Sequence, residues 1–219
     1  MTDTTRADSR EMIAVHDMFR REFSASPGLV ENVAPGDEEH AAVVVDHLAF
    51  VSRLLHAHHG AEDALLWPKL EQRAPEDTGT LLTMMRDDHE EIDKRLNAVT
   101  SAAAAWRTAA DAKCRQELLL ALHELLPALD RHLTAEESGA LQLIDAHLSA
   151  DEWAQVGHHG LAELPPEAHV LLFGMLLHDL DPELYELVKR TVPADVFDVV
   201  SVAGPQEYAR HLRLLQGTA

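Results

Sequence analysis

Four stretches of this chain place apolar side chains at alternating intervals of three and four residues, and this spacing constrains the fold more than any other feature. On a helix of about 3.6 residues per turn, side chains spaced in this way fall on one face. Ala, Leu and Val dominate the apolar set and only 5% of residues are aromatic, a composition that favours helix over sheet. The pattern predicts an all-α protein in which four amphipathic helices each turn one stripe toward a common axis.

Proline, glycine and small residues between the stripes predict where the helices end. The first stripe predicts a helix over residues 9–24, and Pro127 is expected to bend the fourth helix. The expected breaks are residues 27–36, Pro68, Pro75 and the small-residue stretch 101–105. Because the connections are short, the simplest packing is an up-down-up-down four-helix bundle.

The last third of the chain differs from the four stripes. We expect the bundle to occupy residues 1–148 and a C-terminal extension of short helices, packed on the bundle, to occupy residues 149–219. Prolines are expected to cut this extension into short pieces, at Pro165, Pro166, Pro182, Pro193 and Pro205.

Composition excludes several classes of function. A formal net charge of -20 would repel phosphate backbones and anionic lipid, so nucleic acid and membranes are poor partners. A single cysteine, Cys114, supplies neither a disulfide nor a thiolate cluster. The polar residues 1–8 lack the apolar core of a signal peptide. We therefore expect a cytoplasmic protein without an Fe–S or structural zinc site.

Six polar side chains interrupt the otherwise apolar stripes at positions that a bundle buries. They are His16, His58, Glu62, His89, His132 and Glu136. A buried imidazole or carboxylate without a partner costs several kcal/mol, on the order of the penalty for an unsatisfied polar or charged group. A metal cluster would satisfy all of them together, whereas any one of these histidines by itself is more often a satisfied core residue.

The spacing of these residues strengthens the metal hypothesis. Residues four apart lie on nearly the same helix face, so His58 with Glu62 and His132 with Glu136 can each reach one centre. Nitrogen and oxygen ligands without thiolate suit iron or manganese and also accept zinc. Six or seven ligands exceed the four of a closed zinc site and suit two ions. A ferritin-type site needs a Glu three residues before a His on two helices, a pattern that these histidines lack.

In order and spacing these residues resemble the hemerythrin family, in the bacterial branch known as the HHE cation-binding domain. The likeness covers roughly residues 9–146. Its motifs are His16, the run HHGAE from His58 to Glu62, His89 within DDHEE, and the run HLTAE from His132 to Glu136. The run LLWP after the second motif is also similar to the family.

The resemblance implies two non-haem iron ions, bridged by the carboxylates of Glu62 and Glu136 and by an oxo or hydroxo group. His59 would then be a seventh metal ligand, since the adjacent residue contributes in some relatives. Oxygen-carrying hemerythrins have a second His four residues after the third-helix ligand, where this chain has Asp93, and their last motif ends in Asp one residue later. These departures count against reversible oxygen carriage.

Three further histidines lie outside this set, one on the second stripe and two near the start of the extension. His47 shares the inner stripe of His58, where it either contacts a bound ligand, supports a metal ligand from behind or is a core residue bonded to a carbonyl. His158 and His159 echo the second motif, but Pro165 and Pro166 follow closely, so we expect a surface turn there.

The function that follows from the resemblance is binding or turnover of O2, nitric oxide or peroxide at the diiron centre. Its enzymatic version is catalase-like, peroxidase-like or oxidase activity. An alternative is a metal-sensing or redox-sensing interaction module without turnover, in which the extension contacts a partner. A third interpretation is a metal-free helical scaffold. The spacing of the motifs does not separate these functions.

Overall fold

The computed structural model describes residues 6–218, and the outermost residues of the two predicted domains, 1–5 and 219, lie outside the described residues. Within 6–218 the chain is all-helical, without a β-strand, which confirms the predicted class. The helices are α1 (Glu11–Asn32), α2 (Glu38–Ala61), the π-helix η1 (Glu62–Leu66), α3 (Trp67–Arg73), the short 3-10 helix η2 (Glu76–Thr78), α4 (Gly79–Ala109), α5 (Ala112–His147), α6 (Ala150–Ala162), α7 (Pro166–Leu176), α8 (Pro182–Thr191) and α9 (Ala194–Leu215). No helix in the described part of the chain is both long and apolar enough to cross a membrane.

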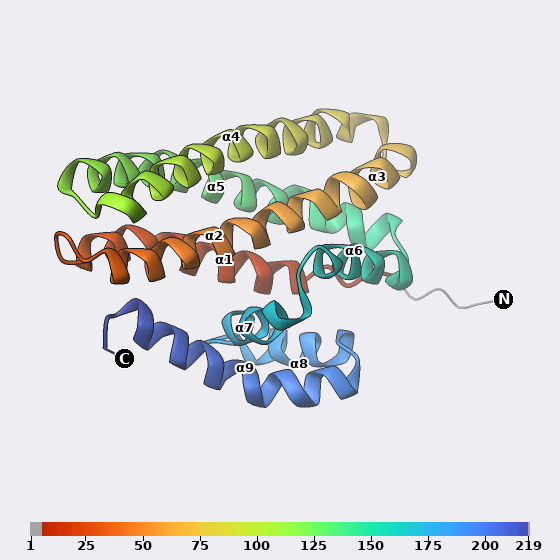
Figure 1. The fold of residues 1–219 in the computed structure, drawn as a ribbon. Coiled ribbons are helices and arrows are strands. Elements are labelled where there is room, and N and C mark those ends of the chain that lie inside the picture. The colour runs from red at the N-terminus through yellow and green to blue at the C-terminus, as the bar shows by residue number, and fades with distance from the viewer. Residues whose placement is uncertain (1–5, 219) are drawn as a thin grey trace.

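Four long helices form the body of the molecule (Figure 1). Contacts run from α1 to α2, from α2 to α4, from α4 to α5 and from α5 back to α1. Large side chains from each helix are fully buried between them, among them Phe23, Leu55, Trp106 and Leu122. Burying one such side chain contributes about 1.5–3 kcal/mol, so the shared interior stabilises all four helices together.

The first helix corrects the predicted break at residues 27–36. α1 continues through Pro27 to Asn32, and the turn is confined to the residues between Asn32 and Glu38. An internal proline costs a helix about 3 kcal/mol. Val30 within the helix and Val33 at its C-terminal cap are both buried at 1% exposure or less, and two buried valines contribute about 3–6 kcal/mol in total. The burial of these valines outweighs the cost of Pro27, so the helix continues through the proline.

The predicted weakening at residues 101–105 is also wrong. α4 runs through this stretch to Ala109, because Ala103 and Trp106 are buried against the core. The turn comes at Ala110, which adopts a left-handed backbone conformation with φ of 44°. Asp111 then accepts a hydrogen bond from the Cys114 amide and caps α5, which passes through Pro127 as one helix.

The second helix changes geometry where its motif ends. α2 stops at Ala61 and continues as η1, in which the Trp67 amide donates to the Glu62 carbonyl across five residues. Pro68, expected to kink or end the helix, lies in the first turn of α3, where a missing amide hydrogen is tolerated. Glu62 is therefore the first residue of a π-turn, a local widening that is frequent at functional sites.

The extension lies along α1 and α2 (Figure 1). α7 and α9 cross closely at Gly174 and Gly204. A Cβ atom on Gly174 would stand 2.2 Å from the carbonyl oxygen of Gly204, so only glycine fits there. α9 corrects the expected break at Pro205, since the helix continues through it with Val200 and Tyr208 buried on either side. The boundary between residues 1–148 and 149–219 stays a prediction.

A polar cluster that is largely buried, the anchor cluster, joins α9 to the bundle. It consists of Glu22, His47, Tyr208 and His211. The Tyr208 hydroxyl donates to Glu22 Oε1 at 2.7 Å, and Arg21 pairs with the same carboxylate at 2.9 Å. His47 Nδ1 lies 3.2 Å from His211 Nε2. His47, expected to meet a ligand or a carbonyl, thus contacts another imidazole.

Candidate metal centre

All seven residues predicted as metal ligands converge in the interior of the bundle. Six of them are exposed by 3% or less, and the side chain of His58 is exposed by 12%. They come from five elements: His16 from α1, His58 and His59 from α2, Glu62 from η1, His89 from α4, and His132 and Glu136 from α5. Residues far apart in the sequence therefore face one space.

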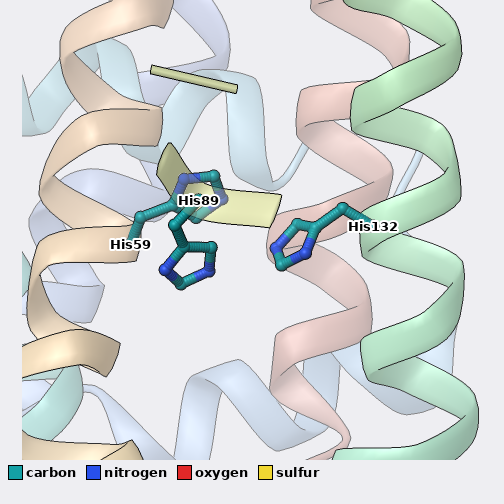
Figure 2. A group of neighbouring side chains, drawn as sticks. All are labelled: His59, His89 and His132. Atoms are coloured by element: carbon teal, nitrogen blue, oxygen red, sulfur yellow. The ribbon is translucent and has the colours of Figure 1, made fainter. Parts of the chain in front are cut away.

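One group of ligand atoms contains three imidazoles, from His59, His89 and His132. Their ligand atoms lie within 4.8 Å of one another. Figure 2 shows the rings of His59 and His89 close together, with His132 reaching toward both of them from α5 on the opposite side. The rings of His59 and His89 are stacked, with centroids 4.0 Å apart. Such a convergence of nitrogen atoms suits one metal ion.

A second group contains His16, His58 and Glu136, again with ligand atoms within 4.8 Å. His16 Nε2 lies 3.3 Å from His58 Nε2 and 3.4 Å from Glu136 Oε2. A third set, His58, His59 and Glu62, links this group to the first one. The three groups therefore adjoin one another through shared histidines.

The two carboxylates reach both groups. Glu62 Oε1 lies 3.3 Å from His58 Nε2, and Glu62 Oε2 lies 3.4 Å from His89 Nε2. Glu136 Oε2 lies 3.4 Å from His16 Nε2 and 3.8 Å from His132 Nε2. Each carboxylate thus stands beside one imidazole of the first group and one of the second.

The residues fit a metal because their buried polar atoms lack other partners. Both nitrogens of His59 and of His132, Nε2 of His89 and all carboxylate oxygens of Glu62 and Glu136 have no hydrogen-bond partner among residues 6–218. Each unsatisfied buried group costs about 1–3 kcal/mol, and more when it is charged. A structure that gathers so many of them at one point is explained by cations that bind them together.

A family comparison agrees with this geometry. The family model described as the hemerythrin HHE cation-binding domain matches residues 8–144. The chain belongs to the hemerythrin HHE family. As a member of that family it binds metal cations, and the His and Glu groups described above provide a site for them. Searches of curated proteins and of solved structures return no match.

Burial and mutual repulsion set the protonation of this hemerythrin site. Burial and the neighbouring His16 lower the pKa of His58 to about 3, and burial lowers the pKa of His132 to about 4. Burial and the nearby Glu136 raise the pKa of Glu62 well above its usual value. Burial opposes charge on His16, but contacts with Glu136 and Glu137 outweigh it and raise the pKa of this imidazole. Burial thus favours the neutral form of His58 and His132, which is the form that coordinates metal.

A layer of carboxylates that the sequence motifs do not predict lies behind the histidines. Glu137 Oε1 accepts a hydrogen bond from His16 Nδ1 at 2.8 Å, and Asp63 Oδ1 accepts one from His89 Nδ1 at 2.9 Å. Asp88 stands 3.8 Å from His132 Nδ1, beyond hydrogen-bond distance. The available signal was adjacency, because each of these acidic residues directly precedes or follows a predicted ligand.

Other acidic and histidine positions lie outside the hemerythrin site. Asp93, at the position where oxygen-carrying relatives have a second His, pairs at 3.4 Å with His56, and both side chains are exposed. His158 and His159 are exposed as expected, but they lie on α6 and not in a surface turn. Two apolar residues of α6, Trp153 and Val156, are buried and pack this helix against the rest of the molecule.

Proposed function

We propose that this hemerythrin HHE domain holds two iron ions and binds or turns over O2, nitric oxide or peroxide. The observation that carries the proposal is the reach of Glu62 and Glu136, each beside histidines of both ligand groups. A carboxylate in that position suits a bridge between two ions, because its two oxygens can serve different metals. A single closed zinc site would use four ligands and leave the remaining buried donors unsatisfied.

Ligand chemistry favours iron over softer metals. All seven donors are imidazole nitrogens or carboxylate oxygens, and the one cysteine of the chain, Cys114, lies outside the site. Seven donors shared between two ions leave coordination positions for a small molecule. Redox-active iron supplies the electrons for such chemistry, and the protein supplies geometry and a dry surrounding.

Aromatic side chains of the chain exclude water from the site. Phe19 packs on the imidazole of His58 with ring centroids 5.4 Å apart, and Trp67 packs near His89 at 6.1 Å. Both aromatic side chains are buried at 1% exposure or less. His58 has the most exposed side chain of the seven at 12%, so a small molecule entering from solvent meets this side of the site first. We infer that the four long helices run up-down-up-down, which lets each present its ligands at the same height.

The test begins with purified protein loaded with ferrous iron without oxygen. We expect two irons per chain by elemental analysis, and near-ultraviolet absorption from charge transfer to iron on oxidation. Mixing with O2, nitric oxide or hydrogen peroxide in a stopped-flow instrument then identifies the small molecule that reacts. A Glu62→Ala variant should lose this response, whereas Asp93→Ala, which alters an exposed carboxylate, should retain it. Stoichiometric zinc with a spectrum insensitive to all three molecules would contradict the proposal.

A second candidate function is a metal-sensing module without turnover. It is favoured by the anchor cluster, because α1 and α2 carry both ligand residues and the contacts that hold α9. Metal occupancy would then change how firmly the extension is held. Hydrogen exchange of α9 in the full chain, with and without metal, measures this directly. Equal exchange rates in both states would remove the sensor from consideration.

A further inference from the structure

Two of the metal-facing histidines have their outer nitrogens occupied by carboxylates from neighbouring helices. His89 on α4 turns Nε2 toward Glu62 and Nδ1 toward Asp63, both residues of η1. His16 on α1 turns Nε2 toward Glu136 and Nδ1 toward Glu137, both on α5. In each case one acidic residue faces the site and the next one in sequence holds a ligand from behind.

The hydrogen bond fixes which nitrogen faces the metal. A carboxylate only accepts hydrogen bonds, so Nδ1 of each histidine carries a proton, and in the neutral imidazole, the form that binds metal, Nε2 is left with a free electron pair. The same contact holds the imidazole plane and strengthens the imidazole as a donor. An imidazole without such a partner rotates about its side-chain bonds and presents either nitrogen, at a cost to metal affinity.

The two carboxylates serve different ligand groups. Asp63 holds His89, a member of the group with His59 and His132. Glu137 holds His16, a member of the group with His58 and Glu136. This division gives each metal position its own outer carboxylate.

The two carboxylates also differ in their other contacts and in their exposure to solvent. Arg20 donates to the same Glu137 oxygen at 2.7 Å and contacts Asp130 at 3.2 Å, which fixes Glu137 from the side away from His16. The side chain of Glu137 is exposed by 24%, whereas that of Asp63 is exposed by 45%. Glu137 is therefore less exposed than Asp63 and has an arginine partner in addition to its histidine.

We propose that Asp63 and Glu137 are positioning residues, each of which orients the histidine ligand of one metal position and sets the affinity of that position alone. The proposal rests on the proposed function, since it requires two metal ions at the site. It adds the residues that make the two positions independent, and it assigns one to each position.

The test is a titration of the metal-free full chain with Co²⁺, monitored by visible absorption and by calorimetry. We expect two binding steps in the unmodified protein. Asp63→Ala should weaken one step by roughly 10- to 100-fold, the usual effect of removing a carboxylate behind a metal-bound histidine, and Glu137→Ala should weaken the other step by a similar factor. The conservative variants Asp63→Asn and Glu137→Gln keep an acceptor oxygen and should retain part of the affinity.

Matched controls separate positioning from general effects of charge. Asp93→Ala removes a carboxylate from an exposed aspartate and histidine pair away from the site, and Asp130→Ala removes another partner of Arg20. Both should change each binding step less than threefold. In the Co²⁺-loaded protein, the shifted proton resonance of the His89 Nδ1–H group should exchange with solvent faster in Asp63→Ala, a signature that a purely structural role would not produce.

The outcomes distinguish the two proposals. If the unmodified protein takes up two Co²⁺ ions and either variant weakens both steps equally or neither step, the positioning proposal is wrong and the diiron proposal stands. If the unmodified protein takes up fewer than two ions, the diiron proposal fails and the positioning proposal fails with it.

Discussion

Replacing His59 by Phe should stabilise the metal-free protein and destabilise the metal-loaded one. His59 is exposed by only 2%, its two ring nitrogens have no hydrogen-bond partner among the described residues, and its ring stacks on that of His89. A phenyl ring keeps the stacking and removes both unsatisfied groups. With burial lowering the pKa of His59 well below its usual value, the imidazole is neutral without metal, so no favourable charge is lost.

The magnitude follows from the two unsatisfied groups. Each unsatisfied group costs about 1–3 kcal/mol when buried, and the variant removes two of them. The larger phenyl ring costs about 1–3 kcal/mol in crowding, so the free energy of unfolding should rise by about 2 kcal/mol. In a chain of this length that gain raises the Tm by about 4–8 °C. With metal present, His59→Phe should lower the Tm. An ion at about 100 times its Kd stabilises the native protein by about 2.7 kcal/mol, and the variant loses one ligand of that ion.

Thermal unfolding followed by circular dichroism, in chelator and in metal, measures both effects. His47→Phe is the matched control, because this buried histidine lies on the same helix and contacts His211 and not the metal site. It should lower the Tm in both conditions. A lower Tm for metal-free His59→Phe would refute the reasoning, since it would mean that His59 is an ordinary satisfied core residue.

Three further predictions concern the extension and the anchor cluster that joins it to the bundle. Gly174→Ala should lower the free energy of unfolding by about 1–3 kcal/mol, because the new Cβ would stand 2.2 Å from the Gly204 carbonyl oxygen. Thermal unfolding measures this loss, and metal content should not change. An unchanged Tm would contradict the close crossing of α7 and α9. Tyr208→Phe should cost about 1.5–3 kcal/mol in urea unfolding, since the buried Glu22 carboxylate loses a donor, and a loss below 0.5 kcal/mol would refute the contact. Burial lowers the pKa of His47 to about 3, so the unfolded chain binds the extra proton between pH 6.5 and 3 and stability falls as pH falls through that window. His47→Gln should reduce this slope by up to about 1.4 kcal/mol per pH unit in metal-free protein, and an unchanged slope would count against it.

The predictable part of the fold and site is the part that periodicity encodes. A ligand from a bundle helix must lie on the inner stripe, so His16 and His89 were found as polar interruptions of apolar spacing. The i, i+4 pairs that end in Glu62 and Glu136 were found because one helix turn separates their members. These features depend on positions within one helix, and sequence spacing reports such positions directly.

The features that were missed depend on contacts between distant segments. The cost of Pro27 to a helix is visible in the sequence and predicts a break, whereas the burial of Val30 that offsets this cost depends on tertiary packing. Asp63 and Glu137 were not singled out, because an acidic residue beside an inner stripe usually faces solvent. The anchor cluster joins residues separated by 164 and 186 positions, and no local pattern predicts such pairs.

A crystal structure of the iron-loaded protein, with anomalous diffraction measured at the iron edge, tests the central claim most directly. The account predicts two anomalous peaks within the bundle, one among His59, His89 and His132 and the other among His16, His58 and Glu136, with Glu62 and Glu136 beside both. A single peak, or peaks outside these ligand groups, would contradict it.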